Sequence, residues 1–165
     1  MGWLKTELER KGGFEVFNPA MPETNTPIFE RWLSHLVKVV GEPQETDVFV
    51  GHSLGCITIL RLLEGLKEGE KVGGVIFVAG FADNLGYQEI DSFFAAPINF
   101  KKIKSHCEKF VAIHSDNDPH VPLKHGDIFK EKLGAKLIKM HKMKHFIGDD
   151  GIAELSVVLE ELLNL

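Results

Sequence analysis

Several features that identify whole classes of protein are scarce or absent in this chain of 165 residues. It has two cysteines, Cys56 and Cys107, which are too few and too far apart to indicate a disulfide framework. Neither a signal-peptide pattern nor an apolar run long enough to cross a membrane is found. We therefore expect a protein of the reducing cytoplasm that does not bind membranes.

An excess of positive charge is also missing, because the net charge is −5. The lysines of segments 101–104 and 139–144 form short local groups, which are typical of solvated surfaces. This balance argues against nucleic-acid binding. A composition of 44% hydrophobic and 26% charged residues is sufficient for a hydrophobic core, and we expect residues 1–165 to form a single domain.

What the chain does contain is a serine within the pattern Gly-x-Ser-x-Gly, at residues 51–55. The apolar run before it predicts a buried strand, and the residues after it have the periodicity of a helix. A serine at such a turn is the nucleophile elbow of α/β-hydrolases. Gly51 and Gly55 lack a Cβ and would let the helix pack closely under the turn. Ser53 is thus the candidate nucleophile, and the backbone N–H of Leu54 is the candidate oxyanion donor. The simpler interpretation is a glycine-bounded turn with a serine N-cap and no chemistry.

An α/β-hydrolase also needs an acid and then a histidine after the serine. The apolar strand predicted at 110–114 runs into a proline-bounded loop that contains two aspartates. Asp118 is the preferred acid because Pro119 and Pro122 stiffen the loop around it. Asp116 could instead form a turn with its own backbone. Without the serine pattern, both aspartates would be interpreted as turn formers.

The histidine should follow the next strand, predicted at 135–140 on an edge of the sheet because its polar and apolar residues alternate. His141 and His145 both come after this strand. We prefer His145 because it lies farther into the loop, where it can fold back over the sheet edge. An i, i+4 histidine pair on a helix could instead bind a metal, but no carboxylate or cysteine has a matching zinc spacing and the intervening lysines would repel a cation. We expect neither a metal nor a cofactor.

The other histidines have no assigned chemistry. His52 is expected to pack or hydrogen-bond beneath the elbow rather than act as the base. The rest are expected at the surface or as satisfied core residues: His35, His106, His114, His120 and His125. Three aromatic residues are candidates for an acyl pocket, although a core role is more usual for such a group: Trp32, Phe93 and Phe94.

Strand and helix patterns alternate along the chain. Helices are predicted after the elbow and at residues 3–11, 27–40 with Thr26 as N-cap, 87–107, 123–133 and 152–163. Strands are predicted at residues 14–17, 47–50, 72–79, 110–114 and 135–140. This alternation indicates a three-layer, parallel-sheet α/β-hydrolase-like fold. A flavodoxin-like nucleotide binder has the same alternation, but the first turn here carries no glycine-rich phosphate loop.

Several short motifs together resemble the small serine hydrolases typified by retinoblastoma-binding protein nine. They are residues 17–22, 30–33, the elbow through Cys56, 78–82, 118–122 and 144–146. The resemblance covers essentially the whole chain. It implies a compact α/β-hydrolase without a large lid, with a catalytic triad at Ser53, Asp118 and His145.

The resemblance fails at one end of the chain. Members of that family begin with an apolar strand and a His-Gly loop that supplies part of the oxyanion hole, followed by the helix that resembles residues 3–11. This sequence starts at that helix. We therefore expect a sheet that lacks its first, central strand, which would lie between the segment 14–17 and the elbow strand. Either the natural start lies upstream, or the remaining strands close the gap.

The expected function is that of a serine hydrolase, similar to a carboxylesterase, acting through an acyl-enzyme on a small ester or amide. His145 would take the proton of Ser53, and Asp118 would fix the tautomer of the imidazole. An alternative is a catalytically weak hydrolase-fold protein that binds a protein partner, with the elbow retained for structure.

Overall fold

In the computed structural model, which describes residues 2–165, parallel strands form one sheet in the order β1-β2-β3-β4. The strands are β1 (Val48–His52), β2 (Gly74–Val78), β3 (Phe110–Ser115) and β4 (Lys136–Met140). The two central strands, β2 and β3, are buried along their whole length, whereas β1 and β4 are partly exposed. Burial of both faces explains why the central strands are almost continuously apolar.

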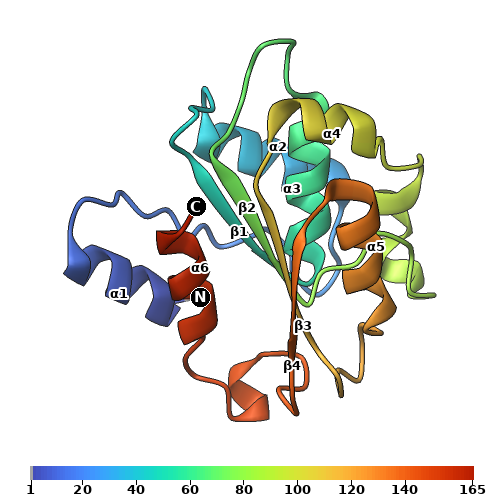
Figure 1. Ribbon diagram of the computed structural model, residues 1–165. Coiled ribbons are helices and arrows are strands. Elements are labelled where there is room, and N and C mark those ends of the chain that lie inside the picture. Colours follow the sequence, from blue (N-terminus) through green and yellow to red (C-terminus); the bar gives the residue numbers. More distant parts are fainter. Residues whose placement is uncertain (1) are drawn as a thin grey trace.

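Helices cover both faces of this sheet, which gives three layers (Figure 1). One face is covered by α2 (Phe29–Val40), α3 (Leu54–Gly65), α4 (Phe100–His106) and α5 (Lys124–Leu133). The other is covered by α1 (Gly2–Lys11) and α6 (Ser156–Leu163), which lie side by side. Two short 3₁₀ helices complete the set, η1 (Gln88–Phe94) and η2 (Gly148–Asp150).

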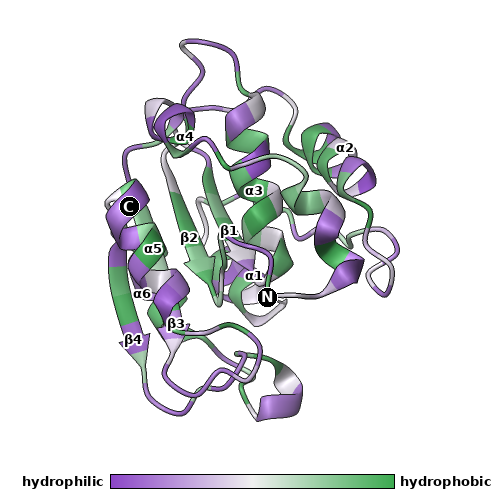
Figure 2. Ribbon diagram, turned by 90° about the vertical axis from the view of Figure 1, so that its right-hand side faces the viewer, coloured by the Kyte–Doolittle hydropathy of each residue, from purple (hydrophilic) through white to green (hydrophobic). Residues whose placement is uncertain are grey.

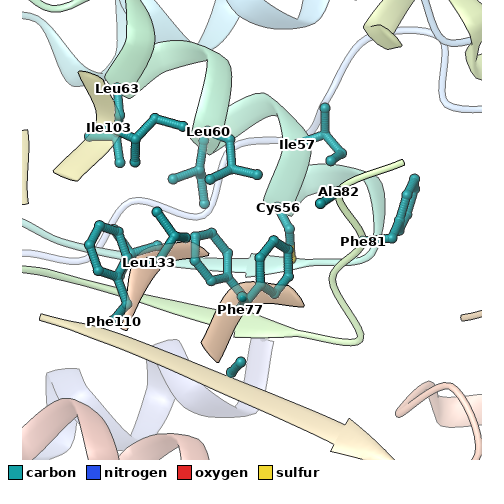
Figure 3. Close-up of a cluster of buried hydrophobic side chains, with 14 of the residues drawn as sticks. Cys56, Ile57, Leu60, Leu63, Phe77, Phe81, Ala82, Ile103, Phe110 and Leu133 are labelled. Carbon is teal, nitrogen blue, oxygen red and sulfur yellow. The ribbon is translucent and has the colours of Figure 1, made fainter. Parts of the chain in front are cut away.

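Alternate residues of β2 point to opposite faces and so build two separate cores. Val75 and Phe77 pack toward α3, where Figure 3 shows Phe77 beneath the apolar residues of that helix. Ile76 and Val78 pack against α1 and α6. In Figure 2, β2 is mostly green, which marks hydrophobic residues, and the helices around it carry purple stretches, which mark hydrophilic residues. The sheet is therefore held from both sides, and its carboxyl edge is left for loops.

The predicted helices and strands are present, with differences at four places. Segment 14–17 is irregular rather than a strand, because no strand among residues 2–165 pairs with it; Phe14 and Phe17 are exposed. The helix predicted from Thr26 begins at Phe29, and its N-cap is Ile28 without a side-chain cap.

The chain turns at Thr26, whose N–H donates to the carbonyl oxygen of Glu23 at 2.9 Å. Ile28 is still extended, with φ −117° and ψ 122°, so the helix begins only at Phe29. The predicted helical stretch 87–107 is divided into η1 and α4, and the last helix begins at Ser156 rather than Ile152. No helix in the described part of the chain combines the length and apolarity that a membrane span requires.

Candidate active site

Ser53 occupies the turn between β1 and α3, at the carboxyl edge of the sheet. Its backbone has φ 52° and ψ −122°, a conformation that residues with a side chain rarely adopt. The turn is fixed to the neighbouring strand, because the N–H of Ser53 donates to the carbonyl oxygen of Val78 at 2.9 Å. A strained residue held in this way at a sheet edge has the geometry of a nucleophile elbow.

The two glycines of the motif do not have equal roles. A Cβ on Gly51 would lie 2.9 Å from the Ile59 side chain and 3.0 Å from the backbone of Cys56, so this glycine lets α3 pack against β1. A Cβ on Gly55 would meet no atom within 4 Å. The prediction that both glycines permit close packing is therefore right for Gly51 and wrong for Gly55.

The three predicted site residues meet at this edge although they come from distant parts of the sequence. The Oγ of Ser53 lies 3.0 Å from Nε2 of His145. The Nδ1 of the same imidazole lies 2.8 Å from Oδ2 and 3.1 Å from Oδ1 of Asp118. With Nδ1–H donating to the carboxylate, Nε2 is left as the acceptor for the serine hydroxyl.

The Asp118 carboxylate is held in a fixed orientation. Its side chain is 1% exposed, and its Oδ1 accepts hydrogen bonds from the N–H groups of His120 at 2.8 Å and Val121 at 3.0 Å. Burial by itself raises the pKa of this carboxyl group. The hydrogen bonds from His145 and the two backbone groups outweigh burial, so the pKa lies below its usual value and the group is ionised near neutral pH.

Asp116 and His141, the alternative candidates for the acid and the base, form a second, separate pair. Nδ1 of His141 lies 2.6 Å from Oδ2 of Asp116, and both side chains are exposed. Neither side chain has a hydrogen bond to Ser53. Residues 141–145 are not helical, so His141 and His145 do not share the helix face that a metal site would use. Within residues 2–165, no three His, Cys, Asp or Glu side chains are grouped to hold a metal ion.

Leu54 begins α3, and its N–H is one of the donors that have no partner within their own helix. No acceptor for this N–H is found in the part of the chain that the structure describes. It lies next to Ser53 at the helix N-terminus, where the backbone dipoles favour negative charge. This is the position that the sequence predicted for an oxyanion donor.

Two further histidines lie beside His145. The sequence predicted for His52 only packing or a hydrogen bond beneath the elbow, and for His120 no role in the site. The His52 ring lies 4.8 Å from the His145 ring, and its Nε2 donates to the carbonyl oxygen of His145 at 2.8 Å. The His120 ring lies 5.0 Å from the His145 ring on an exposed loop, within 3.5 Å of the Tyr87 hydroxyl. The sequence indicated their place in the site only through their closeness to Ser53 and Asp118 along the chain.

A cavity of about 220 Å³ lies on the side of α1 and α6, and its lining includes the sequence neighbours of Ser53 and His145 but neither of those residues. It is lined by Trp3, Leu4, His52, Phe146, Ile147, Gly148, Ile152, Ala153, Leu155 and Val158. The aromatic residues suggested for an acyl pocket are elsewhere: Trp32 and Phe93 are buried in edge-to-face contact within the core, and Phe94 packs against that core. Their core role follows from α2 and η1 packing together.

The Cys56 thiol is fully buried one helical turn beyond Ser53. Burial raises its pKa far above the usual value, and its Sγ faces the carbonyl oxygen of Val78 at 3.6 Å. A thiol that stays protonated and has no access to solvent is a poor nucleophile. Ser53 is therefore the better-placed nucleophile of the two.

Comparison with known sequences gives one consistent result. The profile of a family described as "Serine hydrolase" matches residues 5–164. The chain is 33% identical to YdeN of Bacillus subtilis (strain 168) over 162 residues, which are 97% of this chain and 84% of YdeN. It is 29% identical to serine hydrolase RBBP9 of Rattus norvegicus over 164 residues, which are 98% of this chain and 85% of that protein.

Solved structures agree with the sequences. The crystal structure of the ydeN gene product from B. subtilis matches with a TM-score of 0.93 at 32% identity, covering 99% of this chain and 88% of that chain. A mutant of polyneuridine aldehyde esterase matches with a TM-score of 0.69 at 15% identity, covering 98% of this chain and 91% of that chain. The second likeness establishes a common α/β-hydrolase fold.

Proposed function

Because this chain belongs to the serine hydrolase family, we propose that it is an esterase-like enzyme that cleaves a small ester or amide through an acyl-enzyme on Ser53. The observation that carries the proposal is the continuous chain of hydrogen bonds from Ser53 through His145 to Asp118. This is the arrangement of a Ser-His-Asp triad, in which each member depends on the next.

In the proposed reaction, Ser53 attacks the substrate carbonyl carbon while Nε2 of His145 takes the hydroxyl proton. The same imidazole then gives this proton to the leaving alcohol or amine, and water repeats the sequence to release the acid. Asp118 accepts the Nδ1–H throughout. It thereby keeps the productive tautomer and stabilises the imidazolium that forms, which the buried and hydrogen-bonded state of its carboxylate supports.

The negative charge that develops on the carbonyl oxygen needs fixed donors. We assign the Leu54 N–H to this role, because it is free of backbone partners in the described chain and lies at the positive end of the α3 dipole. Removal of one such donor costs on the order of 10²–10³ in kcat in comparable sites. A large part of the expected rate thus depends on the orientation of this single peptide.

We propose that the cavity on the side of α1 and α6 receives the acyl part of the substrate. Its lining is mainly apolar, and it includes His52 and Phe146, the sequence neighbours of Ser53 and His145. A dry apolar cavity of about 150 Å³ can hold a benzene molecule. The cavity here, at about 220 Å³, accordingly suits a short acyl chain or a single ring rather than a long lipid chain.

Both cysteines, Cys56 and Cys107, are free and buried. Unpaired thiols are normal in a reducing compartment. We propose the cytoplasm as the place of action.

A fluorophosphonate probe and short-chain p-nitrophenyl esters test the proposed function. The wild-type chain should take up the probe and release p-nitrophenol, and Ser53→Ala should do neither. Ser105→Ala is the matched control, because this serine is exposed on α4 and its hydroxyl donates only to the backbone of Lys102. Absence of labelling in a folded wild-type chain would instead favour the alternative of a hydrolase-fold protein that binds a protein partner.

A further inference from the structure

Successive side chains at the carboxyl end of β3 each bind the loop that carries His145. Oδ1 of Asp116 accepts the N–H of Lys142 at 2.9 Å, and Oγ of Ser115 accepts the N–H of Met143 at 2.9 Å. Asn117 Oδ1 accepts the N–H of Lys144 at 2.8 Å. Asp118 then binds the imidazole itself.

Two members of this series, Ser115 and Asn117, are also bonded to each other. The Ser115 hydroxyl donates to Oδ1 of Asn117 at 2.8 Å, while its oxygen accepts the N–H of Met143. Ser115 is buried at the end of β3. The amide oxygen of Asn117 is therefore fixed from the strand side and, in turn, fixes the Met143–Lys144 peptide, one residue before His145.

The loop that carries His145 needs these hydrogen bonds because several of its residues have unfavourable backbone conformations. Lys142, Lys144 and Phe146 have φ values of 57°, 45° and 58°, in the left-handed region that favours glycine. Two of these residues flank His145 in sequence. A loop of this kind keeps its conformation only when surrounding contacts determine it.

We propose that Asn117 is a positioning residue for the base: by holding the N–H of Lys144, it sets the place of His145, so that one imidazole reaches both Ser53 and Asp118. The role rests on the proposed function. Asn117 has no hydrogen bond to Ser53 or to the imidazole, since its oxygen accepts from Ser115 and Lys144. Its effect is on the fraction of molecules with His145 in the productive position.

Replacement of Asn117 by alanine and by aspartate tests this role. Asn117→Ala removes the acceptor for the Lys144 N–H, whereas Asn117→Asp retains an oxygen there. Asn99→Ala is the matched control, because Oδ1 of Asn99 also accepts one backbone N–H, from Lys102, but at the start of α4.

We expect Asn117→Ala to lower kcat on a p-nitrophenyl ester by about tenfold or more, with KM changed by less than about twofold, because the tether acts on turnover and not on binding. Asn117→Asp should recover most of kcat. Asn99→Ala should lower the melting temperature at least as much as Asn117→Ala and leave kcat unchanged. Equal kcat in wild type and Asn117→Ala, or no recovery in Asn117→Asp, would overturn the proposal.

A spectroscopic measurement separates this proposal from the proposed function. In protein with ¹⁵N-labelled histidine, the Nδ1–H of His145 bonded to Asp118 should give a resonance protected from solvent exchange. Asn117→Ala should lose this protection, and Asn99→Ala should keep it. A wild-type chain without esterase activity would refute the proposed function alone, whereas unchanged protection in Asn117→Ala would refute the positioning role.

Discussion

The ring of His52 donates a hydrogen bond from Nε2 to the main-chain carbonyl oxygen of His145, at 2.8 Å. The residue before the candidate nucleophile thus holds the backbone of the candidate base. The bond also determines the tautomer of His52, because the nitrogen that faces a carbonyl must carry the proton. Burial lowers the pKa of His52, so the ring stays neutral while it makes this contact.

This relationship predicts an effect of His52 on turnover. His52→Phe keeps a ring but removes the donor, which leaves the carbonyl of His145 unpaired. A lost hydrogen bond of this kind is worth about 0.5–1.5 kcal/mol, so kcat should fall by roughly two- to tenfold. His120→Phe is the control, because that ring lies at a similar distance from His145 without a bond to its backbone. Equal losses in the two variants would contradict the role of the hydrogen bond.

The two Asp-His pairs should differ sharply in their contribution to activity. Asp118→Asn should lower kcat by on the order of 10³–10⁴, because an amide can favour the wrong imidazole tautomer. Asp116→Asn should have less than about a tenfold effect, since one oxygen remains to accept the Lys142 N–H. Steady-state kinetics on the same ester compares the two, and the reverse ranking would transfer the acid role to Asp116.

Packing under the elbow should distinguish the two glycines by stability. Gly51→Ala places a Cβ about 3 Å from the backbone of Cys56, so we expect a loss of about 1–3 kcal/mol in the free energy of unfolding. Gly55→Ala adds its methyl group to open space in a helix and should be neutral or stabilising by up to about 1 kcal/mol. Urea denaturation measures both. Similar losses at the two positions would show that the close approach is not at Gly51.

Buried histidine should make the fold sensitive to mild acid. Burial, together with the nearby His125, lowers the pKa of His114 to about 4. The unfolded chain then binds a proton below about pH 6.5 that the folded chain does not, so the free energy of unfolding decreases as pH falls from about 6.5 to 4. The loss from this group is up to about 3 kcal/mol, at about 1.4 kcal/mol for each pKa unit.

His114→Gln should remove part of this pH dependence, and His120→Gln, on the exposed loop, should retain it. Urea denaturation at about pH 7 and about pH 5 is the measurement. If His114→Gln loses as much stability as wild type between these two values, the buried imidazole is not the source.

The cavity predicts a limit on acyl length. Ala153→Phe should reduce the space in the cavity and lower kcat/KM for butyrate and hexanoate esters more than for acetate, by roughly ten- to 200-fold, since a methylene in an apolar pocket is worth about 1–3 kcal/mol. Ala96→Phe, at a cavity on the opposite face of the sheet beside Arg61, is the matched control. An unchanged preference in Ala153→Phe would place the acyl group elsewhere.

Much of the fold was determined by the sequence itself. The alternation of apolar runs with amphipathic segments predicted the helices on both faces of the sheet and the edge position of β4, and the resemblance to the serine hydrolases is confirmed over residues 5–164. The strand predicted at 14–17 was wrong because a strand exists only with a partner. Local propensity cannot supply that partner.

The candidate site, like the fold, was predicted in part from the sequence. The sequence placed Ser53 in an elbow and favoured Asp118 over Asp116 and His145 over His141. It could not show which pair reaches the serine, because the members of each choice are similar in spacing and chemistry. The structure forms both pairs but brings only Asp118 and His145 to Ser53.

The contact of Asp118 and His145 with Ser53 depends on the tertiary structure, for a physical reason. The direction of the His145 loop depends on positive φ angles at lysine and phenylalanine residues, which have no sequence signal for that conformation. Hydrogen bonds with Ser115, Asn117 and His52 hold this loop, and these partners come from β3, the loop after β3 and β1. Sequence periodicity describes contacts within an element, whereas this loop is determined by contacts between elements.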